Sequence, residues 1–427
     1  MDETKQKIAF VLGREQEICL AELKAVLSRF CFCFDIYKIS GNVVFANVDN
    51  FTKDDARKAM NVLSGTMKIF ELIGPVEKDI AAQVASVIEK QKTGSEGKIN
   101  FGISYYGKGF SRQHINSIAL TAKKKLKGKF SLRYVESRDS FELSTILTLK
   151  NNLSTKGIEL GLFDQEVGIL IAFNNPEEWN NRDYGKPAFD KYSGMVPPKL
   201  ARMMVNLALD QIGQQSAVSS QQKNCESQTA NCLLIDPFCG SGNILLEAMM
   251  LGCDVVGSDI SEKAVNDTKA NIEWLIEEYK VESIKSKVFE ADASECDFSS
   301  QLTTYNLQLT SLIFVTEPFL GEPKKFMPTA NSAKGEYAKI KELYINFLKN
   351  ILSLAADSSL VLCLVFPLVE TTDGGRFSLF SESVDEIKEM GYTQIRPSLI
   401  YGRDYQVVKR EIVLLKIGQK SQIQNSK

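Results

Sequence analysis

A glycine-rich turn between an apolar strand and a helix constrains the fold of this chain more than any other feature. Residues 232–235 have the pattern of a buried strand, DPFCGSG follows at residues 236–242, and a helix is predicted from about Asn243. Glycines in such a turn let a ligand approach the backbone, and the helix start offers free N–H groups to a negative group. The segment therefore predicts a ligand site in an α/β domain.

Two further predicted strands end in carboxylates. Residues 254–258 lead to Asp259, and residues 287–290 lead to Asp292. The carboxyl ends of strands in an open α/β sheet are where ligands bind, and an acidic group after the second strand accepts hydrogen bonds from ribose hydroxyls. The nicotinamide fingerprint G-x-G-x-x-G would need a third glycine at Leu245, so the pattern indicates a different nucleoside-containing cofactor.

The 427 residues are enough for two or three domains. We predict a small α+β domain over residues 1–75, a second mixed module over 76–178, a polar linker over 179–192 and a domain of alternating strands and helices over 193–420. That alternation is typical of a parallel sheet covered on both faces, so the fold class is α/β. The polar stretch 213–231 is expected to be a flexible surface insertion after a helix that ends at Gly213.

Charge is distributed unevenly along the chain. The formal net charge is -2, yet residues 97–157 hold twelve basic and three acidic side chains, an excess of nine positive charges. The remaining residues are therefore acidic overall. This asymmetry indicates a basic module joined to an acidic one.

Cysteine and histidine usage argues against several classes of site. Nine cysteines are scattered without any C-x-x-C pair, which predicts neither a disulfide framework nor a zinc site. His114 is the only histidine, so histidine-rich metal sites are excluded and no metal is required. No apolar run is long enough for a membrane span and no signal peptide is evident, which favours a cytoplasmic protein.

Several motifs resemble known methyltransferases. The segments DPFCGSGNILLEA, GSDIS and EADAS are similar to the S-adenosylmethionine site of Rossmann-fold methyltransferases. More narrowly, the chain resembles the THUMP-containing tRNA guanine N2-methyltransferases that modify the guanosine at the start of the D-arm, through WNNRDYGKP, PPKLARMMVNLA and YGRDYQVVKREIVLL. FGISYYG and LTAKKKLKGKFSLRYVESRD match the THUMP module more loosely.

The resemblance implies a ferredoxin-like domain and a THUMP module before a class I methyltransferase domain. It also implies roles in binding S-adenosylmethionine. Asp236, Gly240 and Gly242 would shape the site for the methionine and ribose end, Asp259 would hold the ribose hydroxyls, and Asp292 would bind the adenine amino group.

The motif that binds the target amine departs from the family pattern. Amino-methyltransferases of this kind carry D/N-P-P-Y/F after the fourth strand, where this chain has TEPFLG after a predicted strand at 312–315. Either Pro318 and Phe319 align with the last proline and the aromatic, which puts Thr316 in the acidic or amide position, or Glu317 takes that position. Both alignments leave one aromatic ring and make Glu317 a plausible acceptor. The alternative is that the altered motif marks lost or redirected catalysis.

Basic residues indicate where RNA binds. The exposed-type run Lys123, Lys124, Lys125, Lys127 and Lys129 would neutralise phosphates, the alternative being a solvated lysine helix. Arg403 and Arg410 would reach the target nucleotide, or pair structurally with the acidic catalytic domain.

The sequence therefore predicts an S-adenosylmethionine-dependent tRNA methyltransferase acting on the N2 amine of a guanosine. Two alternatives stay open: a non-catalytic RNA-binding protein with a vestigial methyltransferase fold, and an amino-methyltransferase acting on DNA adenine or a protein amide. tRNA is the expected partner. The sequence leaves open the target position, the number of methyl groups and the need for a small activating protein subunit.

Overall fold

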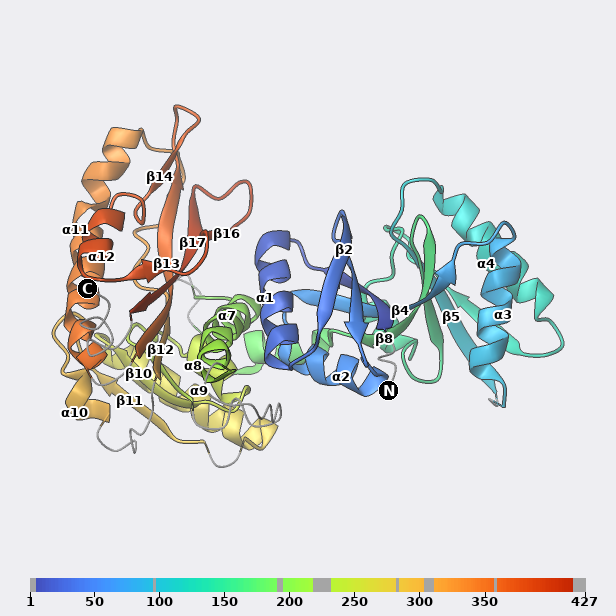
Figure 1. The fold of residues 1–427 in the computed structure, drawn as a ribbon, viewed down its shortest axis with the longest axis horizontal. Helices are drawn as coiled ribbons and strands as arrows, with labels where there is room; N and C mark the ends of the chain where they lie inside the picture. The colour runs from blue at the N-terminus through green and yellow to red at the C-terminus, as the bar shows by residue number, and fades with distance from the viewer. Residues whose placement is uncertain are drawn as a thin grey trace. The chain divides into compact units, whose positions relative to one another are not determined.

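The computed structural model describes residues 5–94, 97–189, 195–217, 232–281, 284–302, 311–356 and 359–417. The chain divides into two compact units (Figure 1). Unit 1 comprises Met1–Leu23 and Phe32–Trp179, and unit 2 comprises Lys24–Cys31 and Asn180–Lys427. Both are built from α-helices and a mixed β-sheet, so the protein is of the α/β type that the sequence predicts.

Unit 1 is organised around one eight-stranded sheet in the order β2-β3-β1-β4-β8-β7-β5-β6. The two modules predicted over residues 1–75 and 76–178 share this sheet, because β4 pairs antiparallel with β8. The elements are β1 (Lys5–Leu12), α1 (Gln16–Arg29), β2 (Phe34–Ser40), β3 (Val43–Asp49), α2 (Lys53–Val62), β4 (Thr66–Pro75), α3 (Ile80–Lys92), β5 (Lys98–Tyr105), α4 (Arg112–Lys125), β6 (Ser131–Val135), α5 (Thr145–Lys150), β7 (Ile158–Leu162), β8 (Glu166–Phe173) and α6 (Pro176–Asn180).

Strand β7 contains a charged residue among buried apolar ones. Glu159 is fully buried in β7 and pairs with Lys68, which is also buried. Its carboxylate accepts further hydrogen bonds from Ser104 Oγ (2.7 Å) and Thr148 Oγ1 (2.6 Å). A buried ion pair persists only when its polar groups are satisfied in this way, and the sequence alone does not reveal those partners.

Unit 2 contains the strand order β11-β10-β9-β12-β13-β17-β15. Strands β9 to β13 are parallel, and β17 pairs antiparallel with β13. The elements are α7 (Pro198–Ala217), β9 (Leu233–Asp236), α8 (Asn243–Met249), β10 (Asp254–Asp259), α9 (Glu262–Tyr279), β11 (Ser286–Glu290), α10 (Phe298–Leu302), β12 (Ser311–Thr316), α11 (Ala330–Ile351), a 3-10 helix (Leu352–Ala356), β13 (Ser359–Glu370), β14 (Arg376–Ser378), α12 (Val384–Glu389), β15 (Thr393–Gln394), β16 (Leu399–Tyr401) and β17 (Val408–Ile417).

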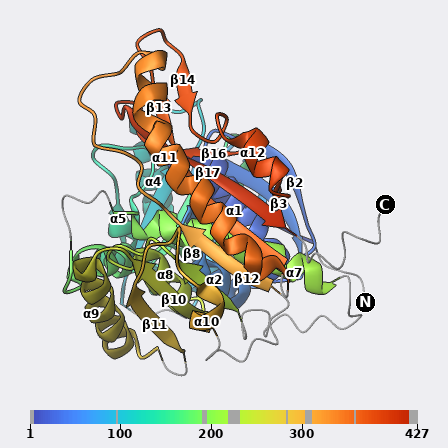
Figure 2. The ribbon, with the colours of Figure 1, turned by 90° about the vertical axis from the view of Figure 1, so that its left-hand side faces the viewer.

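Helices cover both faces of the sheet in unit 2, as the alternating pattern predicts. Figure 2 shows α11 lying across the strands on the side facing the viewer. Its buried residues Tyr344, Phe347 and Leu348 pack in one apolar cluster with β12 and β13. Helices α7, α8 and α9 contact one another and the strands as a second layer. Because strand order reverses between β9 and β12, their carboxyl ends flank the position where such sheets bind ligands.

The predicted linker, residues 179–192, differs from a solvated connector. Residues Asn181–Gly185 form one turn of π-helix, and the side chain of Arg182 is buried. Helix α7 also continues past Gly213 to Ala217, beyond the predicted end. The rest of the predicted flexible insertion, residues 218–231, lies outside the described residues.

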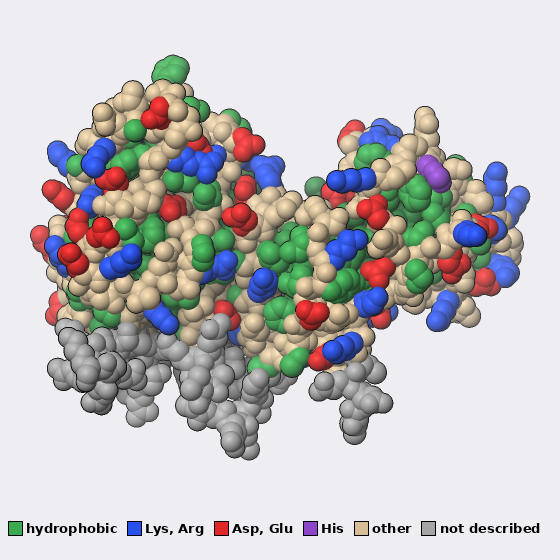
Figure 3. Space-filling model, turned by 45° about the horizontal axis from the view of Figure 1, so that its top comes forward, with side chains coloured by type: hydrophobic (Ala, Val, Ile, Leu, Met, Phe, Trp, Pro, Cys, Tyr) green, Lys and Arg blue, Asp and Glu red, His purple; other side chains and the backbone are tan. Residues whose placement is uncertain are grey.

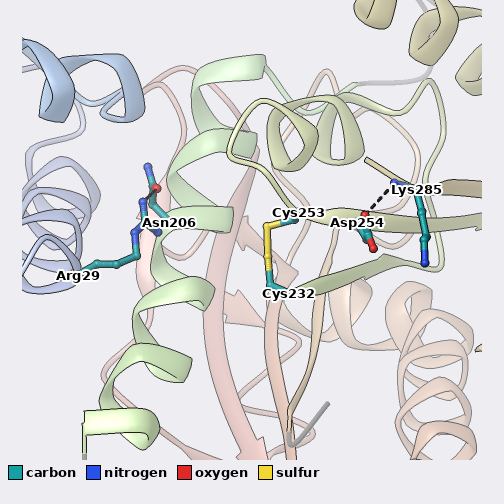
Figure 4. Close-up of a disulfide and its surroundings, with 6 residues drawn as sticks. All are labelled: Arg29, Asn206, Cys232, Cys253, Asp254 and Lys285. Atoms are coloured by element: carbon teal, nitrogen blue, oxygen red, sulfur yellow. Dashed lines mark hydrogen bonds between the residues drawn. A yellow bond between two sulfur atoms is a disulfide. The ribbon is translucent and has the colours of Figure 1, made fainter. Parts of the chain in front are cut away.

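A disulfide between Cys232 and Cys253 joins the starts of β9 and β10 (Figure 4). The sequence predicts no disulfide framework, and this single pair is not among its expectations. The 21-residue separation gives no spacing signal, and the two cysteines meet only because their strands are parallel neighbours. Near the same strand starts, Asp254 Oδ1 accepts a hydrogen bond from the backbone N–H of Lys285 (2.7 Å).

The segment Lys24–Cys31, which includes the end of α1, belongs to unit 2, where Arg29 Nη2 donates to Asn206 Oδ1 of α7 (2.8 Å). Both side chains are drawn in Figure 4. Among the described helices, none is both long and apolar enough to cross a membrane.

Candidate functional site

The turn after β9 depends on glycine at two positions. Gly240 and Gly242 have φ values of +53° and +85°, a left-handed conformation that favours glycine. A Cβ at Gly242 would also lie 2.9 Å from Thr268 Cγ2 of α9. Thr268 Oγ1 donates to the carbonyl of Gly240 (2.8 Å), and this hydrogen bond links the turn to α9. The backbone at the carboxyl end of β9 is thus open to close approach by a ligand.

Asp259 lies at the end of β10, directly beside this turn. Its Oδ2 accepts a hydrogen bond from the backbone N–H of Gly240 (2.9 Å), and its Oδ1 accepts one from Ser261 (3.0 Å). A carboxylate has about four acceptor positions, so these two bonds orient the group without exhausting it. The half-buried carboxylate is therefore fixed at the sheet edge and can still accept donors from a ligand.

Asp292 follows β11 at the same edge. Its Oδ1 accepts hydrogen bonds from the backbone N–H (2.8 Å) and the hydroxyl (2.5 Å) of Ser294. The backbone N–H of Ala291 donates to the carbonyl of Asp259 (3.0 Å), which joins the two strand ends. The three predicted carboxylates consequently end three adjacent parallel strands in the order β11-β10-β9.

Asp236 is buried at the end of β9 and lies against β12. Thr316 Oγ1 donates to Asp236 Oδ1 (2.5 Å), which also accepts from the backbone N–H of Phe238 (3.2 Å). Burial raises the pKa of Asp236 to about 7, although these two hydrogen bonds oppose the rise. The contact between Asp236 and Thr316 brings together the glycine-rich turn and the start of the TEPFLG motif.

Glu317 is paired with Arg410 of β17. Arg410 Nε donates to Oε2 (2.5 Å) and Nη2 donates to Oε1 (2.9 Å), a bidentate arrangement. Burial raises the pKa of Glu317, and the neighbouring guanidinium opposes that rise. Arg410 is thus paired within unit 2, which corresponds to the structural one of its two predicted roles.

The other motif residues and Arg403 differ in exposure. Pro318 is buried, whereas Phe319 is 52% exposed. Arg403 is exposed on the turn between β16 and β17, where its Nη1 donates to the hydroxyl of Tyr405 (2.6 Å). Phe319 is thus the motif side chain that is available to a planar ligand.

A buried charged network beneath the glycine-rich turn was not predicted. Glu247 of α8 accepts from Arg182 Nε (2.8 Å) and Arg202 Nε (2.7 Å), and all three side chains are buried. Lys186 Nζ donates to Asn243 Oδ1 at the start of α8, and burial lowers the pKa of Lys186 to about 8. The sequence signal was the pair of basic residues in WNNRDYGKP together with the glutamate in the helix after the turn.

The predicted RNA-binding lysines are all exposed, on α4 and the turn after it. Figure 3 shows Lys and Arg side chains at the end of unit 1 that α3 and α4 form, interspersed with acidic groups. Lys125 pairs with Asp79 (3.2 Å) and Lys129 with Glu89 (2.7 Å). Within the described residues no ion pair involves the remaining three lysines of the run, Lys123, Lys124 and Lys127.

Curated relatives confirm the resemblance that the motifs suggested. The chain is 27% identical to a tRNA (guanine(10)-N2)-dimethyltransferase of Methanocaldococcus jannaschii over 80% of this chain and 88% of that protein. It is 29% identical to a protein of the same name from Methanothermobacter thermautotrophicus over 46% of each.

Among solved structures, a possible methylase from Clostridium difficile 630 matches with a TM-score of 0.48 and 12% identity, covering 97% of this chain and 98% of that one. A family model described as DNA methylase, of the N6 and N4 methyltransferases, matches residues 33–270. The match spans more than half of the 427 residues. The chain therefore belongs to this DNA methylase family.

Proposed function

We propose that this protein is an S-adenosylmethionine-dependent tRNA methyltransferase that methylates the exocyclic N2 amine of a guanosine. The observation that carries the proposal is the similarity to the tRNA (guanine(10)-N2)-dimethyltransferase of Methanocaldococcus jannaschii, which extends over 80% of this chain and 88% of that protein. A similarity of that length includes parts of both units. Unit 2 is then the class I methyltransferase domain, and unit 1 combines the ferredoxin-like and THUMP modules.

The residues at the carboxyl ends of β9, β10 and β11 fit such a cofactor. Gly240 and Gly242 add no side chains to the turn, and Asp259 keeps acceptor capacity beside it. We assign Asp236, Gly240 and Gly242 to the methionine and ribose end, Asp259 to the ribose hydroxyls and Asp292 to the adenine amino group. When bound, S-adenosylmethionine supplies an electrophilic methyl group on its sulfonium.

The residues that follow β12 would hold the target base. A guanine N2 amine is a weak nucleophile because its lone pair is delocalised into the ring, so orientation and charge stabilisation provide most of the catalysis. Phe319 is exposed enough to stack on the base. Thr316 is engaged with Asp236, which leaves Glu317 and the backbone around Pro318 as acceptors for the amine.

Glu317 acts as a hydrogen-bond acceptor in this arrangement. Arg410 donates to both of its oxygens and makes the carboxylate less basic than a buried glutamate alone. Each carboxylate oxygen has a second acceptor position, so Glu317 can orient the amine and stabilise the positive charge that develops on its nitrogen.

The basic run of unit 1 would dock the RNA. We assign Lys123, Lys124, Lys125, Lys127 and Lys129 to phosphate contacts, supported by their exposure and by the excess of positive charge around them. Arg403 is assigned to the nucleotide side of unit 2, where it is exposed. Arg410 is assigned to positioning Glu317.

A second candidate function is methylation of an amine in DNA, which the description of the family model favours. Adenine N6 and guanine N2 are both exocyclic amines, so the residues that follow β12 do not by themselves distinguish the two. Competition separates the candidates: unlabelled tRNA suppresses methylation of a tRNA substrate, whereas duplex DNA does not.

The experiment that tests the proposal is incubation of purified protein with labelled S-adenosylmethionine and unmodified tRNA transcript, followed by nucleoside analysis. Labelled N2-methylguanosine is expected. Tight tRNA binding without binding of S-adenosylhomocysteine would instead indicate a non-catalytic RNA-binding protein. The cytoplasmic location and the small activating subunit stay predictions.

A further inference from the structure

The loop between β12 and α11 displays large apolar side chains next to the target motif. Phe326 is 84% exposed and Met327 is 48% exposed, on the same loop as Phe319. Among the large hydrophobic residues that the structure describes, Phe326 is the most exposed and Tyr405 follows at 73%. A cluster of exposed apolar groups is a marker of an interaction surface, whereas single exposed residues are ordinary.

This loop is held in place at several points. Lys324 pairs with Glu336 of α11, and the backbone N–H of Thr372 donates to the carbonyl of Pro328 (3.0 Å). Gly321 has a φ of +91°, and a Cβ there would lie 3.0 Å from the hydroxyl of Tyr337. Phe326 and Met327 therefore project from an anchored loop, so that little ordering entropy is lost when they contact a partner.

Residues at the end of β13 link the loop between β12 and α11 to the turn that carries Tyr405. Thr372 bonds to Pro328 on one side, and two residues earlier the backbone N–H of Glu370 donates to the carbonyl of Val407 (2.8 Å). In Figure 1, α11 begins at the same upper end of unit 2 as β14. We call Phe326, Met327 and Tyr405 the apolar rim.

The charge around the apolar rim suits a nucleic acid. Lys325 is exposed directly before Phe326, and Arg403 lies beside Tyr405 with its guanidinium 5.7 Å from the ring centre. Aromatic side chains with neighbouring cations are the combination that binds unstacked bases, because stacking and phosphate neutralisation act together. A purely apolar protein partner would not require these cations.

The chemistry of the target requires bases to be unstacked. In a paired stem the N2 amine of guanine donates to its partner base, and an enzyme that acts on such an amine must extrude the nucleotide from the stack. Extrusion exposes the flat faces of the neighbouring bases and costs a few kcal/mol of lost stacking and pairing. A protein surface that contacts those exposed base faces lowers the free energy of the opened RNA helix.

We infer that the apolar rim contacts the nucleobases adjacent to the target guanosine and stabilises the opened RNA helix while the guanosine is in the site. The inference rests on the proposed function and adds an RNA contact surface to it. Phe326 is the principal contact, since it has the largest exposed area next to the motif. Met327 follows Phe326 in the loop, and Tyr405 lies on the turn that the end of β13 links to this loop.

The test compares Phe326→Ala with wild type on two RNAs that differ at one position, one with the target guanosine paired and one with an abasic site opposite it. We expect about tenfold lower kcat/KM for the variant on the paired RNA, from the loss of one stacking contact. On the unpaired RNA the variant is expected to match wild type within about twofold, since opening is no longer required. Met327→Ala and Tyr405→Ala should show the same pattern to a smaller degree.

A matched control is Ile276→Ala, which removes an exposed apolar side chain from α9, and which should behave as wild type on both RNAs. Binding of S-adenosylhomocysteine, measured by calorimetry, should be unchanged in every variant. A second readout is 2-aminopurine fluorescence placed beside the target, which should rise less with Phe326→Ala than with wild type.

Two results would overturn the inference. Equal losses on both RNAs would show that the apolar rim acts in RNA binding or catalysis without stabilising the opened helix, and unchanged activity on both would show that it contacts no base. The proposed function fails in a different way. Wild type that methylates neither RNA would disprove it, and this inference with it, before any variant is compared.

Discussion

Thr316 Oγ1 lies 2.5 Å from Asp236 Oδ1, a contact between residues 80 positions apart at the ends of β12 and β9. It crosses the point where the strand order reverses, which is where open α/β sheets bind ligands. Through this bond the first residue of the TEPFLG motif touches the carboxylate that begins the glycine-rich turn. The residues that we assign to the methyl donor and to the target base are thus connected directly.

The first prediction concerns the pH dependence of stability at Asp236. Burial raises its pKa from 3.8 to about 7 in the folded protein. A raised folded-state pKa means that protonation stabilises the fold, fully below about pH 4, and that this contribution is lost as the pH rises through about 7. In urea unfolding, wild type should lose stability relative to Asp236→Asn between pH 4 and 8, by at most about 4 kcal/mol.

The control for that series is Asp385→Asn, which removes an exposed carboxylate from the start of α12. Its difference from wild type should stay nearly constant over the same pH range. If Asp236→Asn also gave a constant difference, the carboxyl of Asp236 would not titrate in this window.

The second prediction concerns the pair formed by Glu317 and Arg410. Both side chains are mostly buried, and removing one partner leaves the other charge uncompensated. Arg410→Met should therefore destabilise the protein by about 3–5 kcal/mol. The measurement is chemical denaturation. Arg410→Lys should lose less, because an ammonium keeps the charge although it cannot form the bidentate contact.

The double variant Glu317→Leu with Arg410→Met tests whether the pair is the cause. Replacing both charges with apolar groups removes the uncompensated carboxylate, so the double variant should be more stable than Arg410→Met alone. Additive losses would show instead that Arg410 stabilises the fold through other contacts.

The positions of site residues that follow from local sequence pattern could be predicted. Gly240 and Gly242 sit in a turn that only glycine adopts easily, and Asp259 and Asp292 follow apolar strands, so their positions at one sheet edge could be inferred. The partners of the buried charged side chains could not be predicted from the sequence. Arg410 is 93 positions from Glu317, and Arg182 lies in a segment whose polar composition resembles a linker although its side chain is buried against Glu247.

The third prediction concerns the disulfide. Cys232 and Cys253 close a loop of 21 residues, and such a cross-link lowers the entropy of the unfolded chain. The double variant Cys232→Ser with Cys253→Ser should be less stable than the oxidised wild type by about 3 kcal/mol. Thermal unfolding with and without a thiol reductant measures this. Under reducing conditions most of the difference should vanish, and a difference that persisted would be due to packing of the thiols.

The fourth prediction concerns the basic run of unit 1. Lys123, Lys124 and Lys127 are exposed and, among the described residues, form no ion pair, so their charges are available to phosphates. Changing these three to Gln should weaken tRNA binding and reduce the slope of log Kd against log salt by roughly one unit for each lysine that contacts a phosphate. Binding of S-adenosylhomocysteine, measured by calorimetry, should not change.

A matched triple variant separates this effect from net charge alone. Lys269, Lys349 and Lys388 are exposed on α9, α11 and α12, and their replacement by Gln removes the same number of charges from unit 2. Screening confines each charge to a distance of about 10 Å at 0.1 M salt, so only lysines that lie against the RNA change the slope. An equal change of slope in both triple variants would show that α4 is not the docking element and would leave its lysines as a solvated helix face.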